Sequence, residues 1–297
     1  MNVFPFVSIL IANYNRENFL PKAIESALNQ TYTNLEIVIV DDFSTDRSWE
    51  ILTAFAQKYP QIRIEQNKSN LGVGYTKKKL LDEAKGEILF ILDSDDAIAK
   101  QAVSKSVEIH LKNPEVGLVY TDQFMCNVAL QPLKQESISR KIPKHESHLS
   151  FHGIGHLVSI KKSAYNKIPG LNPNLKVAVD QDLYYQMEEV APIQFLNEKL
   201  YFYRQNMASI SLNQNKHRAW NQKIELIEQA IERRMKAGSA LKLPSSRMLY
   251  LSKWYSRHKL GPGNILIATR IATQEFNFKV LAYIAEYHLR RSIFRYL

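Results

Sequence analysis

Short, continuous apolar runs alternate with segments of helical periodicity in the N-terminal part of this chain, and this alternation restricts the fold more than any other feature. The runs are Val7–Ala12, Leu35–Val40, Ile62–Glu65, Ile88–Leu92 and Val116–Tyr120. A strand that is apolar on both of its sides is buried on both faces, as in a parallel sheet covered by helices. The sequence therefore predicts an α/β fold with a mostly parallel sheet flanked by helices.

The segments between the first strands have the spacing of amphipathic helices. Residues 17–30 carry four apolar side chains at this spacing: Phe19, Ala23, Ala27 and Leu28. Residues 44–59 carry four more: Trp49, Leu52, Phe55 and Ala56. Ser44 or Asp46 can cap the second helix. Both segments are therefore expected to be helices that pack on the sheet, which is covered on both sides.

Polar clusters follow three of the predicted strands at the point where each strand ends. The first strand is followed by "NYNR", the second by "DDFSTD" and the fourth by "DSDD". In open parallel sheets, ligands bind in the crevice outside the carboxyl ends of the strands. We therefore expect the three clusters to converge on one ligand site.

The "DSDD" cluster places Asp93, Asp95 and Asp96 within four positions, and three such carboxylates repel one another. Mg²⁺ or Mn²⁺ would offset this repulsion, since these ions prefer oxygen ligands and are commonly held by one or two carboxylates together with substrate phosphates. The alternative is a solvated turn whose aspartates cap the next helix. The second acidic cluster at a neighbouring strand end favours the metal site, where the ion would also neutralise charge on a departing diphosphate.

Composition narrows the class of protein. The chain has 297 residues, of which 45% are hydrophobic and 23% charged, as in a globular protein with a sizeable core. Cys126 is the single cysteine, which excludes an internal disulfide and suits a reducing compartment. The first apolar run lacks a basic start and is short, so it is expected to be a strand rather than a signal peptide. No apolar stretch is long enough for a spanning helix, and a soluble, cytoplasmic protein is expected.

The net charge of +10 is concentrated at the C-terminal end, where residues 211–297 carry 16 Lys and Arg against 5 Asp and Glu. Residues 223–236 have helical spacing, with four apolar side chains on one side: Ile224, Ile227, Ile231 and Met235. This region is expected to be helical and basic. It would meet anionic lipid at the inner face of a membrane or an acidic polymer, or it is a solvated helical surface.

The order and spacing of these motifs resemble the family 2 glycosyltransferases, which have the Rossmann-like GT-A fold. The matching elements are the first strand with "YNR", then "QTY", "VDDFSTD", "NLG", "AKGE" and "LDSDD", over about the first 100 residues. A weaker match continues to residue 211 through "DQDL" and "LYFYR". The resemblance divides the chain into a nucleotide-sugar-binding half (1–105), an acceptor-binding half (106–210) and the basic helical region (211–297).

The resemblance implies a nucleotide-sugar donor, most often UDP-linked, and a glycan or lipid-linked acceptor. Tyr14 would lie against the base, and Asp42 would accept a hydrogen bond from it. The full predicted nucleotide site is Ala12, Tyr14, Asn15, Asp42, Lys77, Asp93 and Asp95. The metal, Mn²⁺ or Mg²⁺, would be held by Asp95 and Asp96.

The resemblance also implies an inverting transfer whose catalytic base comes from the "VDQDL" segment. Its first acid is replaced by Val179, so the base is assigned to Asp180, with Asp182 as second choice. A carboxylate opposite the leaving group would remove the proton of the acceptor hydroxyl, which contributes about 10²–10⁴-fold to the rate. A solvated helix start is the alternative for this segment on its own.

Several positions depart from the family pattern. Phe43 stands where the family often has Gly. Lys77 replaces an arginine, so it would meet the diphosphate as a point charge, or Lys77–Lys79 form a solvated helix face. Asn206 replaces a histidine that many relatives carry. If that histidine is a metal ligand, coordination here is weaker or uses another residue such as His217. His152 and His156 are spaced like zinc ligands but are expected to line the acceptor pocket.

These departures leave open a catalytically inactive nucleotide-sugar-binding scaffold of the same fold. A nucleic-acid-binding protein is the third reading, suggested by the charge of the C-terminal region alone. That region has no recognisable nucleic-acid-binding module, and no nucleic-acid partner is expected.

Overall fold

The structure of the chain is a computed structural model, and it describes residues 4–137, 139–144, 146–205, 222, 225–227, 229–230, 232–234 and 236–237. The chain divides into two compact units, the first made of Met1–Ile142 and His152–Arg233, the second of Pro143–Phe151 and Arg234–Leu297. In the second unit the structure describes the short helix α5 (His148–Phe151), and Arg234 Nη1 donates a hydrogen bond to Ser147 Oγ at 3.4 Å. The sheet and the candidate site belong to the first unit. The predicted boundaries at residues 105 and 210 stay a prediction.

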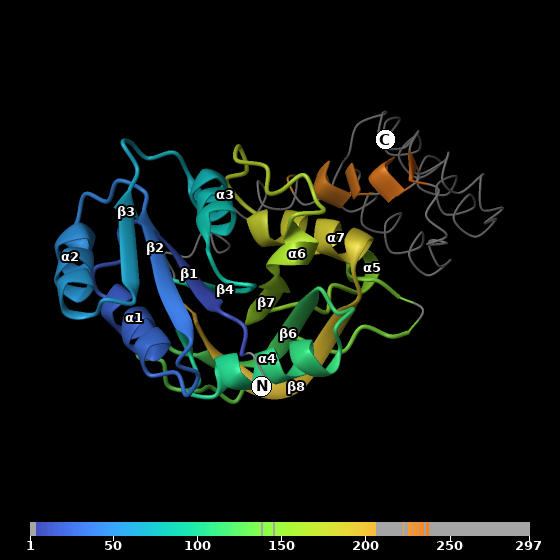
Figure 1. The fold of residues 1–297 in the computed structure, drawn as a ribbon, viewed down its shortest axis with the longest axis horizontal. Helices are drawn as coiled ribbons and strands as arrows, with labels where there is room; N and C mark the ends of the chain where they lie inside the picture. Colours follow the sequence, from blue (N-terminus) through green and yellow to red (C-terminus); the bar gives the residue numbers. More distant parts are fainter. Residues whose placement is uncertain are drawn as a thin grey trace, which may run out of the picture. The chain divides into compact units, whose positions relative to one another are not determined.

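One eight-stranded mixed sheet forms the centre of the first unit, in the order β3-β2-β1-β4-β7-β6-β8-β5 (Figure 1). Its strands are β1 (Val7–Asn13), β2 (Leu35–Asp41), β3 (Ile62–Gln66), β4 (Ile88–Asp93), β5 (Ala97–Ile98), β6 (Leu118–Cys126), β7 (Val158–Lys161) and β8 (Ile193–Arg204). Strands β3, β2, β1 and β4 are mutually parallel, as predicted. Strand β7 pairs antiparallel with β4 and β6, and β5 pairs antiparallel with β8. The sequence did not predict this antiparallel part.

Helices flank the sheet: α1 (Leu20–Leu28), α2 (Ser48–Lys58), α3 (Val73–Glu83), α4 (Ala102–Lys112), α6 (Lys162–Tyr165) and α7 (Val179–Val190). The chain moves outward from β1 to β3 and then returns past β1 to β4. Right-handed crossovers therefore place α1 and α2 on one face and α3 on the other (Figure 1). Ile24 of α1 and Leu52 of α2 share a buried cluster with Ile9 and Ile37 of the sheet. Each such buried side chain stabilises the fold by about 1.5–3 kcal/mol.

The start of α2 differs in detail from the prediction. Arg47 occupies the N-cap position and makes no side-chain capping bond. Asp46, one of the two expected caps, accepts a hydrogen bond from the Ser48 N–H at 2.9 Å. The Ser44 cap is wrong, because this hydroxyl donates to Asp41 Oδ1 at 2.6 Å and so belongs to the loop after β2.

Strands β1, β2 and β4 end at the same edge of the sheet. Asn13 is the register partner of Asp41, and Ala12 is the partner of Asp93. The three polar clusters that follow these strands therefore meet at one edge, as predicted from the carboxyl ends of parallel strands.

Beyond β8, part of the predicted helix 223–236 is described, and Leu226, Ile227 and Ala230 in it are buried. Arg233 makes two hydrogen bonds to the carboxylate of Glu189 on α7, at 2.9 and 3.0 Å. Ile224, Ile231, Met235, Asn206, His217 and residues 238–297 lie outside the described residues. Among the residues that are described, no helix has the length and apolarity that crossing a membrane requires.

Candidate active site

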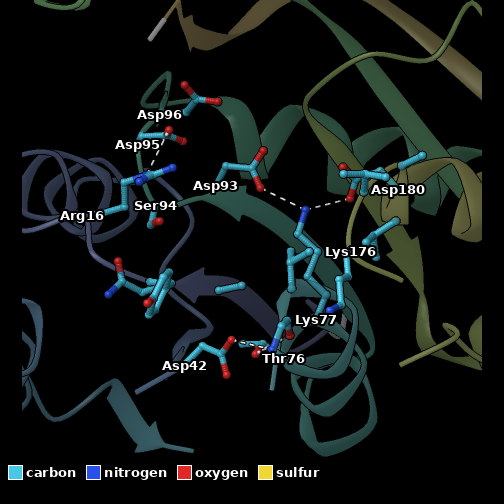
Figure 2. Close-up of a pocket in the computed structure, with 18 of the residues that line it drawn as sticks. Arg16, Asp42, Thr76, Lys77, Asp93, Ser94, Asp95, Asp96, Lys176 and Asp180 are labelled. Carbon is cyan, nitrogen blue, oxygen red and sulfur yellow. Dashed lines mark hydrogen bonds and ion pairs between the residues drawn. The ribbon is translucent and has the colours of Figure 1, made fainter. Parts of the chain in front are cut away.

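A cavity of about 630 Å³ opens at the edge of the sheet where β1, β2 and β4 end. Its walls are built from these strand ends, the start of α3, the segment before α7 and the end of β8. The carboxylates that line it are Asp42, Asp93, Asp95, Asp96 and Asp180 (Figure 2). All five belong to the predicted site, and they come from three parts of the chain that are distant in sequence.

Asp42 organises the loop that leads into α3. It is buried and accepts hydrogen bonds from the N–H groups of Leu71 (2.9 Å) and Gly72 (2.8 Å) and from Asn67 Nδ2 (2.8 Å). A carboxylate accepts roughly four hydrogen bonds, so one acceptor position remains for a ligand. The predicted contact between Asp42 and a base stays a prediction.

Asp41, which the sequence analysis did not single out, fixes the neighbouring loop. Its fully buried carboxylate accepts hydrogen bonds from Asn13 Nδ2 (2.8 Å), from the Ser44 N–H (2.9 Å) and from Gln66 Nε2 (3.0 Å). These bonds join the ends of β1, β2 and β3. The apolar run before it could have suggested that Asp41 is the last, buried residue of its strand.

Besides Asp42, three residues of the donor half were expected at the nucleotide end of the site: Ala12, Tyr14 and Asn15. Ala12 and Tyr14 line the cavity, and the Tyr14 side chain is 42% exposed. Asn15 does not line it, because its side chain bonds to Thr45 of the adjacent loop. Phe43 also lies outside the lining and has a φ of 61°, in the left-handed region that favours glycine. A glycine, which the family resemblance implies here, would adopt this backbone conformation without strain.

Asp95 and Asp96, which follow the end of β4, have different surroundings. Asp96 is buried, and its carboxylate accepts hydrogen bonds from Tyr201 Oη and the Arg204 N–H, both at 2.7 Å. Burial, followed by the charges of Asp95 and Asp93, raises the pKa of Asp96 well above its ordinary value. Asp95 Oδ2 lies 3.3 Å from Arg16 Nε, and burial and then Asp93 raise the pKa of Asp95. Asp95 is therefore the more accessible of the two predicted metal ligands.

Lys77 connects two of the aspartates that line the cavity, Asp93 at the end of β4 and Asp180 at the start of α7. Its ammonium donates hydrogen bonds to Asp93 Oδ1 (3.0 Å) and Asp180 Oδ1 (2.8 Å), and Figure 2 shows it between the two carboxylates. Burial alone would lower the pKa of Lys77, but Asp180 and then Asp93 outweigh it and raise the pKa. Burial would likewise raise the pKa of Asp93, yet Lys77 and His156 hold it below its ordinary value. Lys77, Asp93 and Asp180 thus form an ion-paired triad, in which Lys77 is buried and the two aspartates are partly exposed.

The two candidates for the catalytic base are placed differently by the start of α7. Asp180 lines the cavity, whereas Asp182 does not. Asp182 is buried and its Oδ2 accepts a hydrogen bond from the Asn172 N–H at 3.2 Å. Asp182 thus holds the preceding loop, and the geometry favours Asp180 for chemistry.

The two histidines spaced like zinc ligands do not act together. His156 lines the cavity, its Nε2 lies 3.9 Å from Asp93 Oδ2, and its ring stacks on Tyr201 and Tyr203 with centroids 5.1 and 5.8 Å apart. His152 does not line the cavity. Cys126 is buried, as expected of a small apolar residue.

The cavity residues that had no role assigned from the sequence include four with long polar side chains: Arg16, Lys176, Tyr203 and Arg204. Arg16 stands in "NYNR" and Arg204 in "LYFYR", so the motifs that contain them were a usable signal. Arg204 donates hydrogen bonds to the carbonyl oxygens of Asp95 and Val128. Lys176 stands in no motif, and only the fold brings it to the cavity.

The residues after β4 fit a divalent cation of the kind that binds phosphates. In the part of the chain that is described, no three His, Cys, Asp or Glu side chains converge as a complete metal site would need. Mg²⁺ and Mn²⁺ at phosphate sites take one or two carboxylates from the protein and complete their shell with phosphate oxygens and water. Asp93 and Asp95 supply such a partial set of hard oxygen donors.

The segment before α7 packs against α3 at Gly74. The Gly74 N–H donates a hydrogen bond to the Leu175 carbonyl oxygen at 3.1 Å. A Cβ at this position would lie 2.5 Å from that oxygen and 2.9 Å from the Asn172 oxygen. Both are backbone atoms, so any side chain here must displace the segment that leads to Asp180.

We expect Gly74→Ala to lower kcat by about 10²-fold, since a displacement of about 1 Å at a reacting group has that effect. Binding of the predicted nucleotide should be retained, because the added Cβ would meet the segment before α7 and neither Asp42 nor Tyr14. Gly86→Ala is the matched control: its Cβ would lie 2.4 Å from the Ser8 nitrogen, outside the cavity. It should lower the melting temperature without a comparable loss of kcat in the folded protein. Equal kcat losses in both variants would contradict a positioning role of Gly74.

Residues 8–169, more than half of the chain, match glycosyl transferase family 2, and the chain belongs to this family. Among its relatives is the chondroitin synthase of Escherichia coli, 32% identical over 198 residues, which are 66% of this chain and 28% of the synthase. The chain therefore spans about a quarter of the length of that relative.

Two solved structures have the same fold. S. aureus TarS 1–349 in complex with UDP-GlcNAc has a TM-score of 0.61 at 15% identity, covering 97% of this chain and 92% of that chain. The mannosyltransferase PcManGT from Pyrobaculum calidifontis in complex with GDP-Man and Mn²⁺ has a TM-score of 0.58 at 17% identity, covering 97% and 87%. The predicted GT-A fold is confirmed.

Proposed function

We propose that this family 2 glycosyltransferase transfers a sugar from a nucleotide-diphosphate sugar to a hydroxyl of a glycan or lipid-linked acceptor, in one displacement with inversion and with the help of Mn²⁺ or Mg²⁺. The observation that carries the proposal is the meeting of Asp93, Asp95 and Asp180 in one cavity, with the Lys77 ammonium between Asp93 and Asp180. The relation to a chondroitin synthase supports a role in polysaccharide synthesis.

The donor is proposed to be UDP-linked. A solved structure of the same fold, TarS, holds UDP-GlcNAc, while PcManGT holds GDP-Man, so the fold accepts either nucleotide. Tyr14 would lie against the base, and the remaining acceptor position of Asp42 would receive its N–H. Asp42 is well placed for this because its other bonds fix the loop before α3.

The metal would be held by Asp95 and Asp93, with the Asp96 carboxylate occupied by Tyr201 and Arg204. When bound, it would offset the negative charge of the departing diphosphate. Arg16, beside Asp95, adds positive charge at the same wall. Asp180 Oδ2, the oxygen that does not bond to Lys77, would accept the proton of the acceptor hydroxyl.

The experiment is to measure UDP release from UDP-sugars with the full chain, with Mn²⁺ and with EDTA. We expect turnover of at least one UDP-sugar that EDTA abolishes and Mn²⁺ restores. Asp95→Asn should raise the Mn²⁺ concentration for half-maximal activity by about 10- to 100-fold or more. Mutation of residues that only hydrogen-bond to a metal ligand already lowers metal affinity by that amount. Asp122→Asn, outside the cavity, is the matched control. Activity that is indifferent to EDTA in the wild type would overturn the metal-assisted reaction.

A further inference from the structure

Lys176 differs from the other basic side chains that line the cavity. Lys77 lies between two carboxylates, Arg16 lies beside Asp95, and Arg204 donates to main-chain oxygens. Lys176 is exposed, and within the described ranges no ion pair or hydrogen bond engages its ammonium. A positive charge with no partner in the protein is thus presented to the cavity.

The backbone that carries Lys176 is held firmly in place. Its two neighbours, Leu175 and Val177, are buried, with exposures of 3% and 5%. The Leu175 oxygen accepts the hydrogen bond from Gly74, and the chain then enters α7 through Ala178, whose φ is 55°. The alternation of buried and exposed residues directs Lys176 away from the core, and the Gly74 contact fixes where its side chain begins.

Lys176 belongs to the wall of the cavity that carries Asp180. It precedes Asp180 by four residues, and Figure 2 shows both on the side of Lys77 opposite to Arg16 and Asp95. In an inverting displacement the base and the leaving group lie on opposite sides of the reacting carbon. Lys176 is therefore expected to face the saccharide, while the diphosphate lies toward Asp95.

A ligand that fills this part of the cavity removes water from the Lys176 ammonium. The hydroxymethyl group of a neutral sugar compensates poorly for the lost hydration, because a desolvated charge needs a charged partner. A carboxylate restores the lost interaction through a charge-assisted hydrogen bond. The chemistry of the wall thus favours an acidic sugar over its neutral counterpart.

We propose that Lys176 is a specificity-determining residue that binds the carboxylate of an acidic saccharide, carried either by the transferred sugar or by the acceptor. This inference rests on the proposed function, because it takes Asp180 as the base. It names a substrate class, sugars of the uronic acid type, that the family assignment leaves open.

The test measures, with the full chain and Mn²⁺, the binding of UDP, UDP-glucose and UDP-glucuronic acid, and then of methyl glucoside and methyl glucuronide in the presence of UDP. The wild type should favour the acidic member of one pair by about 10- to 100-fold, the range expected of a charge-assisted hydrogen bond. Lys176→Gln should abolish that preference, and Lys176→Arg should keep most of it. Lys167→Gln is the matched control, since Lys167 is exposed and lies outside the cavity lining.

The outcomes separate the alternatives. If Lys176→Gln loses the preference for UDP-glucuronic acid over UDP-glucose, the carboxylate belongs to the donor. If it loses the preference for methyl glucuronide over methyl glucoside, the carboxylate belongs to the acceptor. Both results support the proposal. An equal loss for UDP and both UDP-sugars would show that Lys176 binds the diphosphate, and no change at all would show a solvated lysine; both overturn it while leaving the proposed function intact. If the wild type binds no nucleotide, the proposed function fails and this inference fails with it.

Discussion

Asp180→Asn is expected to lower kcat by about 10²–10⁴-fold, the usual contribution of a positioned general base. This corresponds to a rise of about 3–5 kcal/mol in the activation barrier. The amide has nearly the same shape, and its oxygen can still accept the hydrogen bond from Lys77, but it cannot take a proton from the acceptor. Donor affinity should change little, because the nucleotide end of the cavity is built from other residues.

The measurement is single-turnover transfer from a UDP-sugar that the wild type turns over, together with UDP binding for each variant. Asp182→Asn is the matched control, because Asp182 stands two residues away on the same helix and does not line the cavity. Its amide oxygen can still accept the bond from the Asn172 N–H, so near wild-type kcat is expected. If Asp180→Asn kept full activity, the base would lie elsewhere. UDP binding without turnover in the wild type would favour the inactive scaffold.

The site residues that could be predicted from the sequence are those that directly follow the end of a strand. Apolar runs show where strands end, and the ends of parallel strands meet at one edge of a sheet. Asp42, Asp93 and Asp95 were found in this way, and the register of β1 with β2 and β4 confirms that their strands end together. The boundaries were also close, as in Val7–Ala12 against the observed Val7–Asn13.

What the sequence could not supply depends on contacts between distant segments. Nothing near Asp96 indicates that Tyr201 and Arg204 occupy its carboxylate, since these partners lie more than 100 residues away. The same holds for Lys77, because nothing near it in the sequence indicates that its ammonium joins Asp93 to Asp180, 103 residues away. The antiparallel strand β7 was missed because "HLVSI" is short and its pairing with β4 is set by the returning chain.

Lys77→Met is expected to destabilise the fold and to abolish most activity. Lys77 is buried, with its side chain 8% exposed, and methionine has a similar length without the charge. The substitution leaves the carboxylates of Asp93 and Asp180 without their shared cation. Breaking a buried ion pair by removing one partner costs about 3–5 kcal/mol of the free energy of unfolding. Catalysis should fall as well, because Asp180 loses the bond that orients it.

Chemical denaturation measures the effect on stability, and single-turnover transfer measures the effect on activity. The adjacent lysine, Lys78, supplies the control. Lys78→Met removes a more exposed lysine that pairs with Asp82 on the same helix, and it should cost less than about 1 kcal/mol. The double variant Lys77→Met/Asp180→Asn should regain part of the lost stability, since one uncompensated carboxylate is gone, yet remain inactive. Lys77→Arg keeps the charge and should lie between wild type and Lys77→Met in both measurements. Wild-type stability and activity in Lys77→Met would mean that the two carboxylates do not depend on this lysine. The ion-paired triad would then have no part in holding the base.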